Sequence, residues 1–330
     1  MSDMSLRNRR KQQVVRTLQL DQAAIEIVQA LKRQGVPCLL LKGASIASWL
    51  YPNELRSYVD VDILVPCSHW QQAVQHIEDL GFVFDQSEPT GGNWYRARDR
   101  AWLDLHDTLA GLAVPKTQVW ETLWNERATM QLHGHAIPIL NDRARLFHVV
   151  MHAIQTGNAK TKAAEDVSRA VARLPFVLWQ AAWEVAVSLR AEQRFAASLR
   201  LYAEGGELLA DRFGAPQQVP FSYVVDAVAQ TPGIRTVAAF TQSDWHARRT
   251  LLKHWLWPTE SLPAALDRSK GARVPSWIRQ RQSPTLKFYL WRGWQVWSFI
   301  RVLPAALRLR RASDRAADRQ AYSRPWRDDR

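Results

Sequence analysis

The pattern of apolar residues changes at about residue 140, and this change constrains the fold more than any other feature of the chain. Before it, helix-like and strand-like segments alternate: residues 20–35 have helical spacing and end at a glycine, whereas 38–41 and 59–65 resemble buried strands. After it, residues 144–209 have helical spacing with little strand character. The pattern predicts an α+β fold, with a small mixed β-sheet and flanking helices followed by a helical domain.

The chain has 330 residues, enough for two domains, and 47% of them are hydrophobic, as in ordinary globular proteins. We place an α+β domain at residues 1–140 and a helical domain at 141–257. Residues 258–330 form a connector and a basic, Trp/Arg-rich helical tail. The two cysteines, Cys38 and Cys67, are too few for a disulfide framework and are expected to be buried thiols.

The first 20 residues are charged and lack the apolar core of a signal peptide, and no apolar run is long enough to span a membrane, so we expect a cytoplasmic protein. The net charge is +13, but residues 271–330 hold 14 Lys and Arg against 4 Asp and Glu. Most of the positive charge therefore lies in the tail. A nucleic-acid partner is not indicated for the first domain and is an open alternative only for the tail.

The tail places Trp291, Trp294 and Trp297 at helical spacing ahead of several arginines. Three interpretations stay open, and packing on the protein's own helical domain is favoured. The second is weak contact with an anionic membrane surface, which would make the protein peripheral at the inner face of a membrane. The third, least favoured, is an Arg/aromatic surface for nucleic acid.

Two carboxylates, Asp60 and Asp62, lie one residue apart on the expected strand 59–65. Because strand side chains alternate, both point to one face, with backbones about 7 Å apart. Such a pair is stabilised by a divalent cation or by solvent, and Mg²⁺ prefers oxygen ligands. An Asp-x-Asp pair alone is more often a solvated strand face than a metal site.

The surrounding residues favour the metal. Lys42-Gly43 opens a helix directly after a buried strand, and backbone N–H groups at such a turn attract phosphate. A third acidic strand residue, Asp104, follows in Leu103-Asp104-Leu105-His106. Three carboxylates beside a glycine turn suit two-metal phosphoryl transfer, in which one aspartate also accepts the proton of the attacking hydroxyl.

These motifs resemble a known family. Leu40-Leu41-Lys42-Gly43, then Arg56 before Asp60-Val61-Asp62-Ile63-Leu64-Val65, and later Asp104-Leu105-His106, are similar to the pattern of the uncharacterised nucleotidyltransferase family. That family belongs to the polymerase-β-like nucleotidyltransferase superfamily. The detailed resemblance covers residues 36–110.

The resemblance implies a role for each matching residue. Asp60, Asp62 and Asp104 would be catalytic and would bind the metal, with two Mg²⁺ ions and an NTP such as ATP as co-substrate. Lys42, Gly43 and Arg56 would hold the nucleotide phosphates. The superfamily usually has Gly-Ser or Gly-Gly at this turn, and the serine hydroxyl contacts phosphate. Here Ala44 follows, so Ser45 is a candidate phosphate ligand one position late.

Two further residues are expected to line the site, His106 on the face of Asp104 and Asp166 on a later helix. His148 and His152 have the spacing of metal ligands on a helix, but no third ligand accompanies them, so we expect them to serve in packing.

The predicted function is Mg²⁺-dependent transfer of a nucleoside monophosphate from an NTP to an acceptor, with release of pyrophosphate. The motifs specify metal and phosphates, and leave open the acceptor, the nucleotide and the oligomeric state. The alternative is a non-catalytic protein in which the nucleotidyltransferase fold binds a partner or a membrane surface.

Overall fold

The computed structural model of the chain describes residues 3–84, 92–112, 114–156, 162–215, 219–220, 223–225 and 283–320. The chain divides into two compact units. The first comprises Met1–Gln86, Gly91–His148 and Glu184–Ala191, and the second comprises Ser87–Thr90, Val149–Trp183 and Glu192–Arg330. The domain boundaries at residues 140 and 257 stay predictions, and residue 257 lies outside the described residues.

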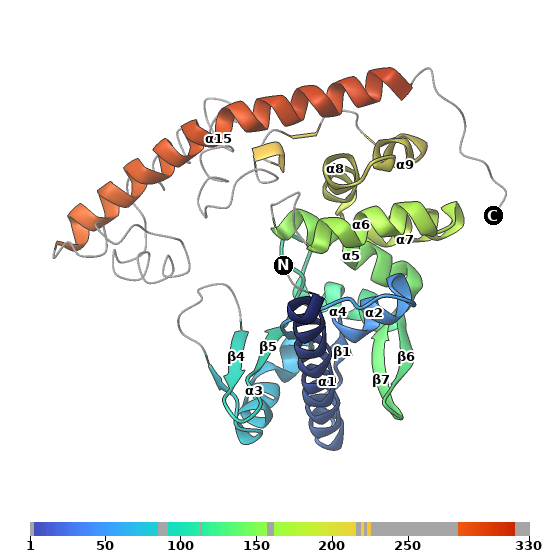
Figure 1. Cartoon of the computed structure of the whole chain (residues 1–330), viewed down its shortest axis with the longest axis vertical. Coiled ribbons are helices and arrows are strands. Elements are labelled where there is room, and N and C mark those ends of the chain that lie inside the picture. The colour runs from blue at the N-terminus through green and yellow to red at the C-terminus, as the bar shows by residue number, and fades with distance from the viewer. Residues whose placement is uncertain are drawn as a thin grey trace. The chain divides into compact units, whose positions relative to one another are not determined.

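A seven-stranded sheet in the order β3-β4-β5-β2-β1-β7-β6 forms the centre of the first unit (Figure 1). Strand β2 is parallel to β5 and β1 is parallel to β7, while the other neighbours are antiparallel. The predicted mixed sheet is thereby confirmed. Its strands are β1 (Leu39–Leu40), β2 (Val61–Leu64), β3 (Val83–Phe84), β4 (Gly92–Arg96), β5 (Ala101–His106), β6 (Arg127–Leu132) and β7 (His135–Leu140).

Two helices cover one face of this sheet. Helix α1 (Asp3–Arg33), dark blue in Figure 1, packs on β2, β5 and β7, and on α3 (Trp70–Asp79). The core beneath them contains Ile63 and Leu105, both almost fully buried. Because strand side chains alternate, the neighbouring positions Asp62, Asp104 and His106 point to the opposite face. Cys38 is buried, as expected, whereas Cys67 is only partly buried in a 3₁₀ turn, Cys67–His69.

The turn between β1 and α2 (Ala44–Leu50) requires a glycine. Gly43 has φ 62° and ψ −119°, a conformation that L-residues with a side chain rarely adopt. A Cβ atom here would lie 3.4 Å from the ring of Tyr58. Backbone conformation and the close aromatic ring therefore both favour glycine at the Lys42-Gly43 turn.

Helix α4 (Lys116–Asn125) precedes β6 in the first unit, and α5 (Asp142–Thr156) follows β7. The second unit is helical in its described part, as predicted. Its helices include α6 (Lys162–Arg173), α8 (Glu192–Tyr202), α9 (Gly206–Arg212) and the tail helix α15 (Pro284–Gln320), while α7 (Phe176–Ser188) runs from the second unit into the first.

The predicted tail helix is present as α15, which continues through Pro304. Trp291 and Phe299 are buried in it, whereas Trp297 and Ile300 are more than half exposed. One side of α15 is thus covered and another is apolar and open. Among the helices that the structure describes, none combines the length and the apolar character that crossing a membrane requires.

Candidate active site

Two parallel strands bring the predicted carboxylates together. In the pairing of β2 with β5, Asp62 lies directly opposite Asp104, and Leu64 lies opposite His106. Residues paired across parallel strands point to the same face, so Asp62 and Asp104 are neighbours on the face away from α1 and α3. His106 follows Asp104 by two positions and shares that face.

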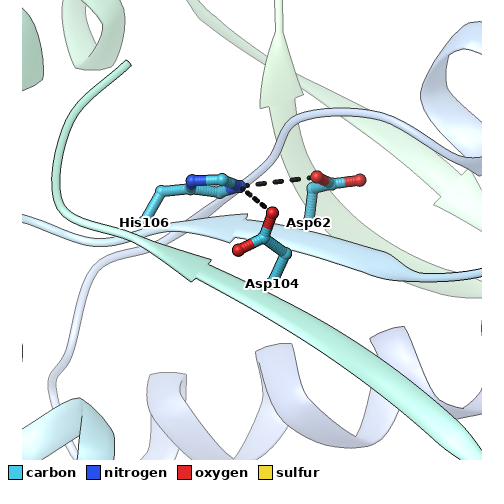
Figure 2. Close-up of side chains that lie close together, drawn as sticks. All are labelled: Asp62, Asp104 and His106. Atoms are coloured by element: carbon cyan, nitrogen blue, oxygen red, sulfur yellow. Dashed lines mark hydrogen bonds and ion pairs between the residues drawn. The ribbon is translucent and has the colours of Figure 1, made fainter. Parts of the chain in front are cut away.

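One ring nitrogen of His106 contacts both carboxylates, as Figure 2 shows. Its Nε2 atom is 3.4 Å from Asp62 Oδ1 and 3.3 Å from Asp104 Oδ2. One potential ligand atom from each of the three side chains falls within 4.8 Å of the others, which is a suitable spacing for one metal ion. Burial lowers the pKa of His106, but the carboxylates of Asp104 and Asp62 outweigh it and raise that pKa to about 9.

Lys42 reaches the same site from the neighbouring strand. β1 is antiparallel to β2, and the Leu41 N–H donates to the Asp62 carbonyl oxygen at 3.0 Å. The ammonium group of Lys42 then lies 2.5 Å from Asp62 Oδ1. Burial of Asp62 would raise its pKa, but Lys42 and His106 hold the pKa well below its usual range. Asp62 is therefore an almost completely buried carboxylate whose charged form is favoured by these two neighbours.

Asp60 lies just before β2 and is only partly buried. It does not belong to the group formed by Asp62, Asp104 and His106. Burial, followed by the charge of Asp62, raises the pKa of Asp60 to about 6. Asp60 thus lies close enough to Asp62 for the two negative charges to repel each other. The third member of the group formed with Asp62 and Asp104 is His106, where the sequence predicted Asp60.

Two carboxylate oxygens of the site point away from the basic side chains. Asp62 Oδ2 and Asp104 Oδ1 are buried, and neither has a hydrogen-bond partner among the described residues. A buried carboxylate oxygen without a donor is energetically costly. A divalent cation with oxygen ligands supplies the partner that such an atom lacks, so the residues present fit Mg²⁺.

Ser45 and Arg56 have structural contacts. The Ser45 hydroxyl donates to the carbonyl oxygens of Leu41 and Lys42, each at 3.2 Å, and stabilises the turn. Arg56 is buried, with its guanidinium carbon 5.9 Å from the ring centre of Tyr51. The phosphate-binding roles of both residues stay predictions.

Asp166 is buried in α6 of the second unit, and its role in lining the site also stays a prediction. His148 is buried on α5, as its expected packing role requires. Burial and then the charge of Lys42 lower the pKa of His148 to about 3. The sequence did not predict that His148 lies near the charge of Lys42, because the three-dimensional fold, not the local sequence, brings α5 close to Lys42.

A family model described as an uncharacterised nucleotidyltransferase matches residues 3–205, more than half of the chain. The chain belongs to this family. Membership supports a nucleotidyltransferase activity. No curated protein matches the chain significantly.

Two solved structures show a distant likeness to this family member. The antibiotic-resistance factor ANT(2'')-Ia is 15% identical, with a TM-score of 0.34, and the match covers 59% of this chain and 92% of that one. An antigenic nucleotidyltransferase-like protein from Paracoccidioides brasiliensis is 13% identical, with a TM-score of 0.32, and the match covers 52% and 93%. Likeness at this level says nothing about substrate.

Proposed function

We propose that the protein is a Mg²⁺-dependent nucleotidyltransferase that moves a nucleoside monophosphate from an NTP to a hydroxyl or phosphate acceptor. One observation carries the proposal beyond family membership. Asp62 and Asp104 stand side by side on parallel strands, each with one buried oxygen that has no donor among the described residues. Two neighbouring carboxylates that each keep one buried oxygen without a donor are suited to bind a cation, whereas in a purely structural pair protein hydrogen bonds would satisfy these oxygens as well.

Asp62 and Asp104 would hold the metal, and Asp60 would add the third carboxylate that a second ion requires. Bound Mg²⁺ supplies positive charge to the phosphate oxygens. His106 is a positioning residue in this proposal, since its Nε2 contacts both carboxylates and fixes their separation. Lys42 neutralises Asp62 and, once a cation takes over that task, can donate to a phosphate at the Gly43 turn.

The transfer itself needs one base. The acceptor oxygen forms a bond to the α-phosphorus, the bond from that phosphorus to the bridging oxygen breaks, and pyrophosphate leaves with the bond electrons. The acceptor proton passes to the Asp104 carboxylate. Asp104 is the better base of the pair because its side chain is 25% exposed, whereas that of Asp62 is 1% exposed and held by Lys42.

Calorimetric titration of the full chain with each of the four NTPs and Mg²⁺ tests the proposal without knowledge of the acceptor. We expect at least one NTP to bind and Asp62→Asn to weaken that binding about tenfold or more, because one anionic ligand of the ion is lost. Asp79→Asn, an exposed aspartate on α3, is the matched control and should bind as the unmodified protein does. Thermal unfolding of both variants verifies that they are folded.

Failure of the unmodified protein to bind any NTP in the presence of Mg²⁺ would overturn the enzyme proposal in favour of a non-catalytic binding protein. If binding is found, pyrophosphate release in the presence of different acceptor classes identifies the reaction.

A further inference from the structure

A cavity of about 680 Å³ lies in the first unit, and Asp62, Asp104 and His106 are not among its lining residues. The part of α1 that precedes Leu20, where its buried apolar residues begin, forms one wall, and β4, β5 and the turn between them form the other. Three basic residues and two aromatic residues dominate its lining, together with an aliphatic side chain: Lys11, Arg16, Arg100, Tyr95, Trp102 and Val15.

Two aromatic side chains form an apolar wall of the cavity. Tyr95 on β4 and Trp102 on β5 are paired in register, and their ring centres are 4.8 Å apart at an interplanar angle of 44°. Trp102 remains 37% exposed, and Val15 across from it is 55% exposed. Open apolar surface of this kind, with an indole at its centre, stacks well with a flat ring.

The three basic residues of the cavity have different roles. Arg16 donates to the Arg100 carbonyl oxygen at 2.7 Å and to the Asp99 carbonyl oxygen at 3.2 Å, which ties α1 to the β4–β5 turn. Lys11 and Arg100 are exposed, and within the described ranges no carboxylate forms an ion pair with either. The cavity therefore combines stacking surface with uncompensated positive charge.

The position of the cavity connects it to the carboxylates. Trp102, Asp104 and His106 alternate with buried residues along β5 and share one face. Trp102 and Asp104 are two residues apart, so their backbones are separated by about 7 Å. A ligand the size of a substituted aromatic ring spans that distance, with its ring on Trp102 and a reactive oxygen near Asp104.

The order of the strands separates the cavity from the expected phosphate turn. Across the sheet the sequence is β4, β5, β2 and β1. The aromatic wall belongs to β4 and β5, the carboxylates to β5 and β2, and the Lys42-Gly43 turn follows β1. The carboxylates thus lie between the cavity and the turn. This is the arrangement that a two-substrate transfer requires, with the NTP on one side and the acceptor on the other.

We propose that this cavity is the acceptor site and that the acceptor is a planar aromatic molecule carrying a negative charge. The identification as acceptor site rests on the proposed function, whereas binding of an aromatic anion does not. Tyr95 and Trp102 would contact the ring, Lys11 and Arg100 would contact the anionic group, and Arg16 would position the turn.

Phenyl phosphate is the probe, titrated calorimetrically into the full chain, with cyclohexyl phosphate and inorganic phosphate as comparison ligands. We expect phenyl phosphate to bind more tightly than either, because only it combines the flat ring with the charge. Trp102→Leu should weaken its binding at least about fivefold, and Lys11→Glu about threefold or more. Lys32→Glu, an exposed charge reversal on the same helix outside the cavity, should leave binding unchanged.

Two results would overturn the proposal. One is the absence of phenyl phosphate binding, and the other is binding that Trp102→Leu and Lys11→Glu leave intact, which would place the anion elsewhere. Asp62→Asn separates this proposal from the proposed function. It should weaken NTP binding and leave phenyl phosphate binding unchanged, whereas Trp102→Leu should weaken phenyl phosphate binding and leave NTP binding unchanged. If the unmodified protein binds phenyl phosphate but no NTP, the cavity is a binding site for an aromatic anion, and its identification as an acceptor site is wrong.

Discussion

Replacement of Lys42 by methionine should destabilise the metal-free protein strongly and make its stability depend on Mg²⁺. The side chain keeps its approximate length and loses its charge. Lys42 is 2.5 Å from Asp62 Oδ1, and the two side chains are 14% and 1% exposed. At an effective dielectric constant of about 20, unit charges at this distance attract each other by roughly 6–7 kcal/mol.

Part of that attraction offsets the cost of removing the two charges from water, so the loss on mutation is smaller than the attraction. Removing one partner of a buried pair typically costs about 3–5 kcal/mol, because the other charge stays buried without compensation. We expect Lys42→Met to lower the free energy of unfolding by that amount in the presence of a chelator. Excess Mg²⁺ should restore part of the loss, since a cation bound to Asp62 stabilises only the folded state.

The assay is urea unfolding followed by tryptophan fluorescence, with and without Mg²⁺. The matched control is Lys116→Met, because Lys116 is also 2.5 Å from a carboxylate, that of Asp107, but is 52% exposed. The control should lose no more than about 1 kcal/mol. A loss of that small size for Lys42→Met, or a loss that Mg²⁺ leaves unchanged, would refute the view that Asp62 depends on a buried counter-charge.

Three further predictions concern pH, the glycine turn and the tail. His148 has its pKa lowered from 6.5 to about 3, so below about pH 6.5 the unfolded chain takes up a proton that the folded protein excludes. As the pH falls below 6.5, the free energy of unfolding should decrease by roughly 1.4 kcal/mol for each pH unit beyond any decrease seen in His148→Phe. Urea titrations at several pH values measure this, and an equal pH dependence in the two proteins would contradict it. Gly43→Ala should lower the free energy of unfolding by about 1–3 kcal/mol. The loss should exceed that of Gly35→Ala, because both glycines have positive φ but, of the two, only Gly43 has a side chain within 4 Å of an added Cβ atom. Equal denaturation midpoints for the two variants would contradict this. The tail helix exposes Trp297, Ile300 and Arg301, so we expect the full chain to float with anionic vesicles and not with neutral ones. Deletion of residues 285–330 should reduce this flotation. Equal flotation of the full and the shortened chain would exclude the tail as the contact.

Local sequence patterns were sufficient to predict the type of fold and part of the site. Alternation along residues 59–65 and 101–106 predicted two strands and put His106 on the face of Asp104, because side-chain direction on a strand depends only on its period of two. The glycine requirement at Gly43 was also readable, since a short apolar run followed by Lys-Gly and a helix leaves few backbone conformations.

The pairing of distant segments was not readable. Nothing local specifies that β2 lies parallel to β5 in the register that sets Asp62 against Asp104. The contact of Lys42 with Asp62 depends on β1 being antiparallel to β2, and Lys42 was therefore expected only at phosphate. The cavity depends on Arg16, which binds carbonyl oxygens 43 and 84 positions away, at Val59 and Arg100.

The two halves of the carboxylate site become available at different times during synthesis of the chain. Lys42 follows β1, which is antiparallel to β2, so its contact with Asp62 requires the closure of only about 20 residues of chain. Asp104 and His106 arrive about 40 residues later and join by parallel pairing, which is slower because a longer loop must close. Of the two basic neighbours of Asp62, Lys42 is therefore the one that the shorter loop brings in, and His106 is the one that the longer loop brings in.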